Sequence, residues 1–251
     1  MLMLLEGERL DYVNDSLSLI QKPEGLTFGT DALLLAGYMQ GSYARGYELG
    51  GGSGIISMLA LTRKKVGHAT VVEVQEEYAD LMRRNAELNG LSERMECVCA
   101  DVRELVGNGT AEVVFTNPPY MKTDSGRANL ASKKNVARHE VFGGIGDFCE
   151  AAKRLLKYGG SFYVVYRPDR LCDLIFEMRR CGLEPKRMTL VFANPAAEPS
   201  MVLIEGRLGG KCGLFATPPL IIYRDEKNSE YGDDMKYIME MGSFPDGFVK
   251  R

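Results

Sequence analysis

The chain has 251 residues, a formal net charge of −3 and 45% hydrophobic residues. This composition is typical of a globular protein with one sizeable core, and it excludes a disordered or solenoid protein. The acidic balance also excludes a protein that coats nucleic acid through its overall charge, so any contact with nucleic acid must be local.

No segment of the sequence reads as a leader or as a membrane span. Glu6 and Glu8 interrupt the apolar start, and the apolar runs fall far below the roughly 20 residues that cross a bilayer. We therefore expect a soluble, cytoplasmic protein with no membrane contact and no obligate protein partner. We expect its six cysteines to be free, buried thiols, and with only two histidines we expect no metal site.

The first predicted element is a β-hairpin over residues 8–21, where apolar and polar residues alternate on both sides of Asn14 and Asp15. We expect this hairpin to lie outside the main core. Residues 1–45 would then form an N-terminal extension.

From Tyr47 onward, short apolar runs alternate with segments of helical period, which predicts βαβ units and a parallel sheet. We expect strands at residues 46–49, 69–74, 95–99, 111–116 and 160–166, and helices at 54–64, 76–89, 147–157 and 168–181.

Two more β-rich runs, residues 186–193 and 200–207, are joined by a loop too short for a crossover helix, so they must pair antiparallel. The predicted fold class is α/β, with a doubly wound, mostly parallel sheet of seven strands over residues 46–207. This arrangement resembles the Rossmann-like class I methyltransferase fold. We expect residues 208–251 to form a tail that packs on this domain.

A glycine-rich turn follows the first strand of the predicted sheet, at the edge where ligands of such sheets bind. It does not match the dinucleotide pattern G-x-G-x-x-G, because neither register has a glycine at the last position. The pattern E-x-G-x-G-x-G, formed by Glu48, Gly50, Gly52 and Gly54, resembles the first motif of S-adenosylmethionine-dependent methyltransferases. There the acidic residue organises the methionine end of the cofactor. The alternative is an ordinary strand-to-helix turn.

Two further acidic residues follow the next two strands. Glu73, followed by Val74, lies 23 positions after Gly50, where a carboxylate can accept hydrogen bonds from both ribose hydroxyls. Asp101, followed by Val102, stands where the methyltransferase family reads the adenine of the cofactor. The alternatives are a solvated carboxylate for Glu73 and a helix N-cap for Asp101.

The tetrapeptide Asn117-Pro118-Pro119-Tyr120 follows the fourth strand on the same edge. The lone pair of an exocyclic amine is delocalised into its ring, so the site must hold that lone pair toward the methyl donor. The Asn117 side-chain oxygen and the Pro118 carbonyl can accept the two amine hydrogens and stabilise the developing positive charge. Tyr120 would stack on the target ring. The alternative is a tight turn with an exposed tyrosine.

The tetrapeptide resembles that of methyltransferases acting on adenine, on guanine N2 or on glutamine of release factors. Release-factor enzymes generally carry a larger leader than 47 residues, and DNA enzymes usually carry a recognition domain that a 44-residue tail cannot supply. We therefore expect RNA as substrate. A guanine-N2 or protein-glutamine enzyme, and a non-catalytic cofactor-binding RNA adaptor, stay open as alternatives.

Nearly the whole chain resembles the bacterial tRNA1(Val) adenine-37 N6-methyltransferase family. The resemblance rests on residues 28–36, the glycine turn, the tetrapeptide and residues 137–140. It implies that Thr30 and Asp31 close over the cofactor and that the segment around Arg138 and His139 approaches tRNA. The alternative for Thr30 and Asp31 is that they form an N-cap of the following apolar helix.

The segment after the tetrapeptide, residues 121–140, carries five basic residues against two acidic ones. We expect Lys122, Lys133, Lys134 and Arg138 to contact RNA phosphates, which would make binding weaken with salt. The alternative is a solvated loop whose lysines only maintain solubility.

Overall fold

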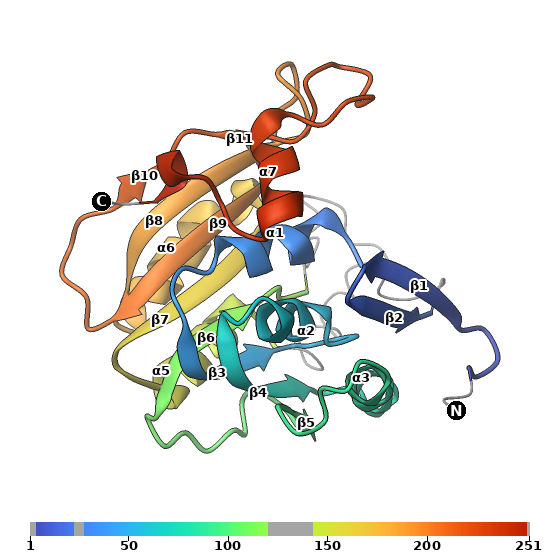
Figure 1. The fold of residues 1–251 in the computed structure, drawn as a ribbon. Coiled ribbons are helices and arrows are strands. Elements are labelled where there is room, and N and C mark those ends of the chain that lie inside the picture. Colours follow the sequence, from blue (N-terminus) through green and yellow to red (C-terminus); the bar gives the residue numbers. More distant parts are fainter. Residues whose placement is uncertain (1–3, 23–27, 120–142, 250–251) are drawn as a thin grey trace, which may run out of the picture.

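A nine-stranded sheet forms the centre of the protein, and helices cover both of its faces (Figure 1). The computed structural model describes residues 4–22, 28–119 and 143–249. Tyr120, Lys122, Lys133, Lys134, Arg138 and His139 lie outside these residues, so the stacking and RNA contacts expected of them stay predictions.

The sheet contains all seven predicted strands. Its first five run parallel, in the spatial order β5, β4, β3, β6, β7, and β9 is antiparallel to both β7 and β8. The strands are β3 (Tyr43–Leu49), β4 (Val66–Glu73), β5 (Met95–Cys99), β6 (Ala111–Thr116), β7 (Leu156–Tyr166), β8 (Leu183–Phe192) and β9 (Pro199–Leu208). The predicted α/β fold with its antiparallel pair is therefore confirmed.

The sheet has two strands more than expected. β10 (Phe215–Ala216) and β11 (Leu220–Ile221) come from the tail and pair in parallel with β8. Each is two residues long, too short for an alternating pattern to stand out in the sequence.

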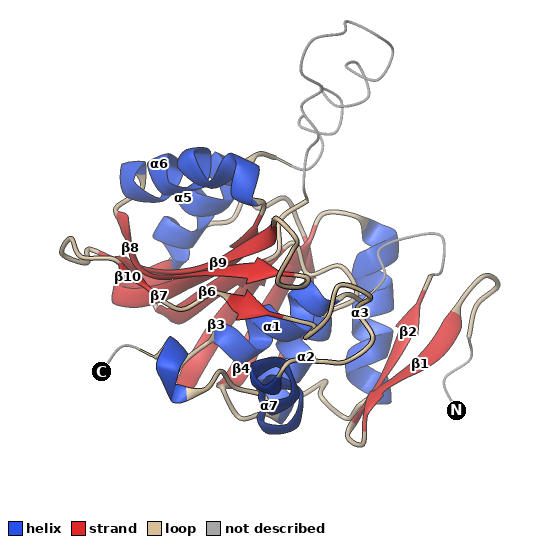
Figure 2. Cartoon of the chain, turned by 90° about the horizontal axis from the view of Figure 1, so that it is seen from above, coloured by secondary structure: helices blue, strands red, loops and turns tan. Residues whose placement is uncertain are grey.

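Alternate residues of each strand point to opposite faces of the sheet, and this creates two cores. Val113 and Phe115 of β6 lie in one core together with residues of α1 and α2, whereas Val114 lies in the other core together with residues of α5 and α6. Figure 2 shows α5 and α6 on one face and α1, α2 and α7 on the other. The helices are α1 (Thr30–Tyr38), α2 (Ile55–Thr62), α3 (Glu76–Leu88), α5 (Ile145–Leu155), α6 (Leu171–Arg180) and α7 (Asp233–Met241), with short 3-10 turns η1 (Pro168–Arg170) and η2 (Asp246–Phe248).

The N-terminal hairpin forms as predicted, from β1 (Arg9–Asn14) and β2 (Leu17–Gln21). The expectation that it lies outside the main core is wrong. Leu17 and Leu19 of β2 are fully buried in the same core as α1 and α2, while β1 is mostly exposed. The hairpin is thus attached to the core of the domain through β2.

Two side-chain amides hold the free edge of β2, that of Asn85 in α3 and that of Asn89, the C-cap residue that follows α3. Asn85 Oδ1 accepts from the Ile20 N–H at 2.7 Å, and Asn85 Nδ2 donates to the Ile20 carbonyl at 3.1 Å. Asn89 makes the same pair of bonds to the backbone of Ser18, at 2.9 and 2.8 Å. The two amides, one helical turn apart, therefore replace a neighbouring strand.

The tail is joined to the sheet through Arg187, whose side chain is 2% exposed. Its guanidinium donates to Glu205 Oε2 at 3.0 Å, to the Phe248 carbonyl at 3.0 Å and to the Tyr38 carbonyl at 2.6 Å. It also lies 3.7 Å from the centroid of the Tyr38 ring. One buried cation thus connects β8, β9, the end of α1 and the tail.

All six cysteines are free thiols, as predicted, but the expectation that they are buried is wrong for Cys99, Cys172 and Cys212, which are exposed. Among the helices in the described ranges, none has the length and apolar character needed to cross a membrane.

Candidate functional site

The strand ends of β3, β4 and β6 bring the glycine turn and the tetrapeptide together. In the ladder, Leu49 pairs with Val72 on one side and with Thr116 on the other. Gly50 and Asn117, the next residues, therefore leave the same edge of the sheet from neighbouring strands. The Thr116 hydroxyl donates to the Leu49 carbonyl at 2.7 Å and ties the two ends.

The glycine turn uses the missing side chains in two ways. Gly50, Gly52 and Gly54 have φ values of +71°, +54° and +80°, a backbone region that glycine adopts readily and other residues adopt rarely. At Gly51 a Cβ would lie 2.2 Å from the Val71 side chain. The turn is therefore a narrow backbone cradle at the start of α2.

Glu48 is fully buried beneath this cradle. Its Oε2 accepts from the Ser57 N–H at 2.9 Å and from the Ser57 hydroxyl at 2.5 Å. Its Oε1 is buried and has no hydrogen-bond partner within the described residues. Burial is the main cause that raises the pKa of Glu48 to about 8, and the nearby Glu73 charge adds to it.

Glu73 lies beside the cradle with 5% of its surface exposed. Its Oε2 accepts from the Gly52 N–H at 3.0 Å, and its Oε1 accepts from the Gln75 N–H at 2.9 Å. Val74, the next residue, is half-buried. These bonds place the carboxylate between the glycine turn and the start of α3.

Asp101 follows β5 and is bound by Arg103. Its Oδ1 accepts from the Arg103 N–H at 2.8 Å, and the Arg103 side chain forms an ion pair with it that lowers its pKa. Residues 102–104 form a turn and not a helix, so the alternative of a helix N-cap is wrong. Val102 is buried in the core beneath α5.

The tetrapeptide meets the start of α1. Asn117 is half-buried, and its Nδ2 donates to Asp31 Oδ2 at 2.7 Å across 86 positions of the sequence. Pro118 is buried and Pro119 is exposed. The N-cap position of α1 belongs to Gly29, so neither Thr30 nor Asp31 is the N-cap.

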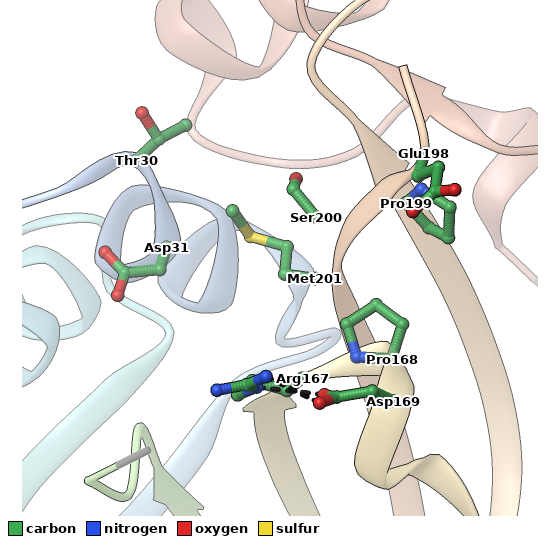
Figure 3. A pocket seen from close by; sticks show the side chains of 9 residues that line it. All are labelled: Thr30, Asp31, Arg167, Pro168, Asp169, Glu198, Pro199, Ser200 and Met201. Carbon is green, nitrogen blue, oxygen red and sulfur yellow. Dashed lines mark hydrogen bonds and ion pairs between the residues drawn. The ribbon is translucent and has the colours of Figure 1, made fainter. Parts of the chain in front are cut away.

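A cavity of about 800 Å³ opens on the β7 side of this contact, within the usual size range of ligand pockets. In Figure 3, Thr30 and Asp31 of α1 lie on one side, and Pro168, Asp169, Glu198 and Pro199 lie on the other. The described residues that line it are Thr30, Asp31, Arg167, Pro168, Asp169, Glu198, Pro199, Ser200 and Met201.

Among the described residues that line this cavity, the guanidinium of Arg167 faces three carboxylates, those of Asp31, Asp169 and Glu198. Arg167 donates to Asp169 through Nε at 2.9 Å and through Nη2 at 2.5 Å. This bidentate pair lowers the pKa of Asp169. The cavity therefore carries an excess of negative charge.

The residues on the side of the cavity opposite α1 were not predicted from the sequence. Arg167 is the first residue after β7, which pairs with β6, so it leaves the sheet at the same edge as Asn117. Its position directly after a predicted strand could have identified Arg167 as a candidate site residue. Glu198, Ser200 and Met201 were not predicted as site residues, although the predicted strand at residues 200–207 begins one position from the observed start of β9.

The chain is similar in sequence to known methyltransferases. Residues 24–178 match the family described as "Methyltransferase small domain". A protein of Phocaeicola vulgatus named tRNA1(Val) (adenine(37)-N6)-methyltransferase is 28% identical over 177 residues, which are 70% of this chain and 74% of that protein. The protein of the same name from Dyadobacter fermentans is 28% identical over 199 residues, 78% of this chain and 82% of that protein.

Solved structures share the fold. A predicted O-methyltransferase from Agrobacterium tumefaciens has a TM-score of 0.69 at 23% identity and covers 86% of this chain and 98% of its own. A geranyl diphosphate C-methyltransferase from Streptomyces coelicolor, in complex with S-adenosyl-L-homocysteine, has a TM-score of 0.53 at 13% identity and covers 71% of this chain and 80% of its own. At these identities the likeness establishes the fold alone.

Proposed function

Because the chain belongs to the methyltransferase small domain family, we propose that it transfers the methyl group of S-adenosylmethionine to the exocyclic N6 amine of an adenine in RNA. The proposed target is adenine 37 in the anticodon loop of a tRNA, the nucleotide named in the relatives from Phocaeicola vulgatus and Dyadobacter fermentans. The observation that carries the proposal is the position of Asn117, which lies between the glycine cradle and the acidic cavity.

The cradle has the features that this cofactor needs. Gly50, Gly52 and Gly54 would let the backbone approach it closely, Glu73 would accept from its ribose hydroxyls, and Glu48 Oε1 is a buried carboxyl oxygen with no hydrogen-bond partner among the described residues. The remaining proposed contacts come from Thr30, Asp31, Val74, Asp101, Val102 and Asn117. When bound, the cofactor supplies a methyl group on a sulfonium whose sulfur keeps the electron pair of the broken bond.

Asn117 and Pro118 would act on the target amine. The Asn117 side-chain oxygen and the Pro118 carbonyl accept its two hydrogens and direct its lone pair away from the conjugated ring. As the nitrogen forms its bond to the methyl carbon it becomes cationic, and these preorganised oxygens stabilise that charge. The nitrogen then loses one proton to water, so no strong base is required.

The acidic lining of the cavity suits an uncharged base better than a phosphate. Three carboxylates against one guanidinium repel a phosphodiester and attract a group that donates hydrogen bonds, such as an adenine amine. A loop nucleotide would reach the cavity by leaving its stack, at a cost of a few kcal/mol. Phosphates would instead meet the basic segment at residues 121–140. A cytoplasmic location and independence of a metal belong to the same proposal.

Incubation with isotopically labelled S-adenosylmethionine and separate pools of tRNA, DNA and release factor tests this function. We expect labelled N6-methyladenosine in tRNA, identified by mass spectrometry of nucleosides. Labelled methylguanosine would instead indicate a guanine-N2 methyltransferase, and labelled methylglutamine would indicate a protein-glutamine methyltransferase. RNA binding without turnover would indicate an adaptor.

Asn117→Ala is the matched control for that assay. Turnover should fall by roughly 10²- to 10³-fold, the loss typical of a preorganised polar group that acts in the transition state. Cofactor affinity, measured by calorimetry, should barely change. Near-normal turnover would contradict the mechanism.

A further inference from the structure

Asp31 lies in the first turn of α1 and joins that helix to the turn after β6. Its Oδ2 accepts from Asn117 Nδ2 at 2.7 Å, and its Oδ1 accepts from the Ala32 N–H at 2.9 Å. Resting on the function proposed above, we propose that Asp31 is a positioning residue. It fixes the orientation of the Asn117 amide so that the carbonyl oxygen of that amide faces the target amine.

The chemistry of the two groups determines the orientation. An asparagine amide has nearly the same shape when its oxygen and its NH2 group exchange places, so shape alone does not select one. An ionised carboxylate only accepts hydrogen bonds, so the group of Asn117 that faces Asp31 must be NH2. The opposite orientation would bring two acceptors together beside Asp31 and would present a donor to an amine that also donates.

Asp31 is itself held in place. The positive end of the α1 dipole favours a carboxylate in its first turn, and the bond to Ala32 satisfies one N–H that the helix leaves free. Gly29 provides the room, because a Cβ at that position would lie 2.6 Å from Asp31 Oδ1. Its φ of −122° is one that any residue adopts, so glycine is required here for space.

Gly29 therefore offers a variant that moves the Asp31 carboxylate without deleting any hydrogen-bonding group. We expect Gly29→Ala and Asp31→Ala to lower kcat by roughly 10- to 100-fold, the range for losing one hydrogen bond to a charged group. Asp31→Asn keeps an acceptor but loses the charge and can itself flip, so its kcat should fall between Asp31→Ala and wild type. The KM for RNA should stay close to wild type in all three, and because Asp31 is also a proposed cofactor contact, any rise in the Kd for the cofactor should be smaller than the loss of kcat.

Asp234→Ala is the matched control. Asp234 is an exposed acidic residue in the first turn of α7, so this variant removes the same type of helix-end charge outside the proposed site. Its kcat should equal that of wild type.

A double-mutant cycle separates action through Asn117 from a direct role. In the Asn117→Ala background, Asp31→Ala should cause no further loss of kcat, because the group that Asp31 positions is gone. A full additional loss would overturn the proposal. So would a raised cofactor Kd with unchanged kcat at saturation, which would make Asp31 a cofactor ligand.

Hydrogen exchange of the Asn117 side-chain NH2, followed by NMR in the protein alone, gives a readout that needs no substrate. Exchange should be slow in wild type and faster in Asp31→Ala and Gly29→Ala. If wild type exchanges as fast as the variants, the contact does not hold the amide and the proposal fails. If exchange behaves as expected but no methyladenosine forms, only the proposed function fails.

Discussion

Glu205 on β9 and Glu48 on β3 are both buried in the same sheet, and they differ in what surrounds their oxygens. Glu205 lies opposite Arg187, which binds it at 3.0 Å and uses its other nitrogens on two backbone carbonyls. Glu48 meets a single hydroxyl residue, Ser57, through one oxygen, and its other oxygen has no partner in the described structure.

This difference separates a structural site from a proposed binding site. A buried polar group without a partner costs about 1 to 3 kcal/mol, so a fold retains it only where something else compensates. The Arg187 network is complete within the chain and connects four elements. At the Glu48 site, Oε1 lacks a hydrogen-bond partner among the described residues, and the site lies beneath the turn proposed to hold a cofactor.

The largest effect should come from breaking the complete network. Arg187→Ala leaves Glu205 buried without its cation and removes the bonds to the tail and to α1. We expect the free energy of unfolding to fall by about 3 to 5 kcal/mol, the range for removing one partner of a buried pair. Urea unfolding measures it. The double variant Arg187→Met with Glu205→Leu should recover most of the loss, and equal losses in both would mean that packing matters more than charge.

Glu48→Gln should change how stability depends on pH. In an unfolded chain Glu48 has its ordinary pKa, whereas burial raises the pKa in the folded protein to about 8. The folded state therefore holds an extra proton between these values, and its stability falls as pH rises through that window. The glutamine variant has no carboxyl group at this position and therefore lacks this pH dependence of stability.

The stability difference between Glu48→Gln and wild type should therefore shift in favour of the variant by about 2 to 3 kcal/mol between pH 6 and pH 8. Denaturant unfolding of the cofactor-free protein at a series of pH values measures it. A constant difference would show that Glu48 does not carry the proton.

The next smaller effect concerns Glu73, whose carboxylate is held in place but keeps capacity for more donors. Glu73→Ala should weaken cofactor binding by roughly 10- to 100-fold, as expected for lost hydrogen bonds to a charged acceptor. Glu73→Gln retains the shape and should lose less. Calorimetric titration giving wild-type affinity for the alanine variant would remove Glu73 from the site.

The sequence predicted the parallel strands well, because buried β-strands and amphipathic helices differ in period. β5 and β6 begin and end at the predicted residues. The glycine turn and the tetrapeptide were found for a related reason: each follows a strand, and strand ends share one edge of the sheet.

The same patterns failed where a polar residue is buried. In β8 the buried face carries Arg187 and Thr189, whereas Met188 and Leu190 on the other face are only partly buried. Alternation alone would assign the faces the other way round. Asn85 and Asn89 look like an ordinary polar stripe of α3, and only the folded chain shows that they bind β2 and bury the hairpin. The cavity was not predicted although the start of β9 was predicted to within one residue, because the side chains that face each other across it depend on how α1 packs against the sheet.

The smallest effect should come from a second arginine–carboxylate pair, Arg103 with Asp101, which is the exposed counterpart of Arg187 with Glu205. Arg103→Ala should leave the midpoint of thermal unfolding close to wild type. Solvent screens an exposed ion pair, and the side-chain entropy lost on forming it offsets most of the remaining attraction. The variant also releases Asp101. If Asp101 binds the adenine of the cofactor, Arg103 competes with that contact, so cofactor affinity should stay the same or rise.

Arg9→Ala provides the control, since Arg9 pairs with Asp11 two positions away in the same manner on the hairpin. Both variants should unfold like wild type, and Arg9→Ala should not change cofactor affinity. A clear drop in affinity for Arg103→Ala alone would show that the guanidinium itself contacts the cofactor. In that case the role assigned to Asp101 belongs to the pair, and an exposed ion pair at this edge of the sheet would be part of the binding site.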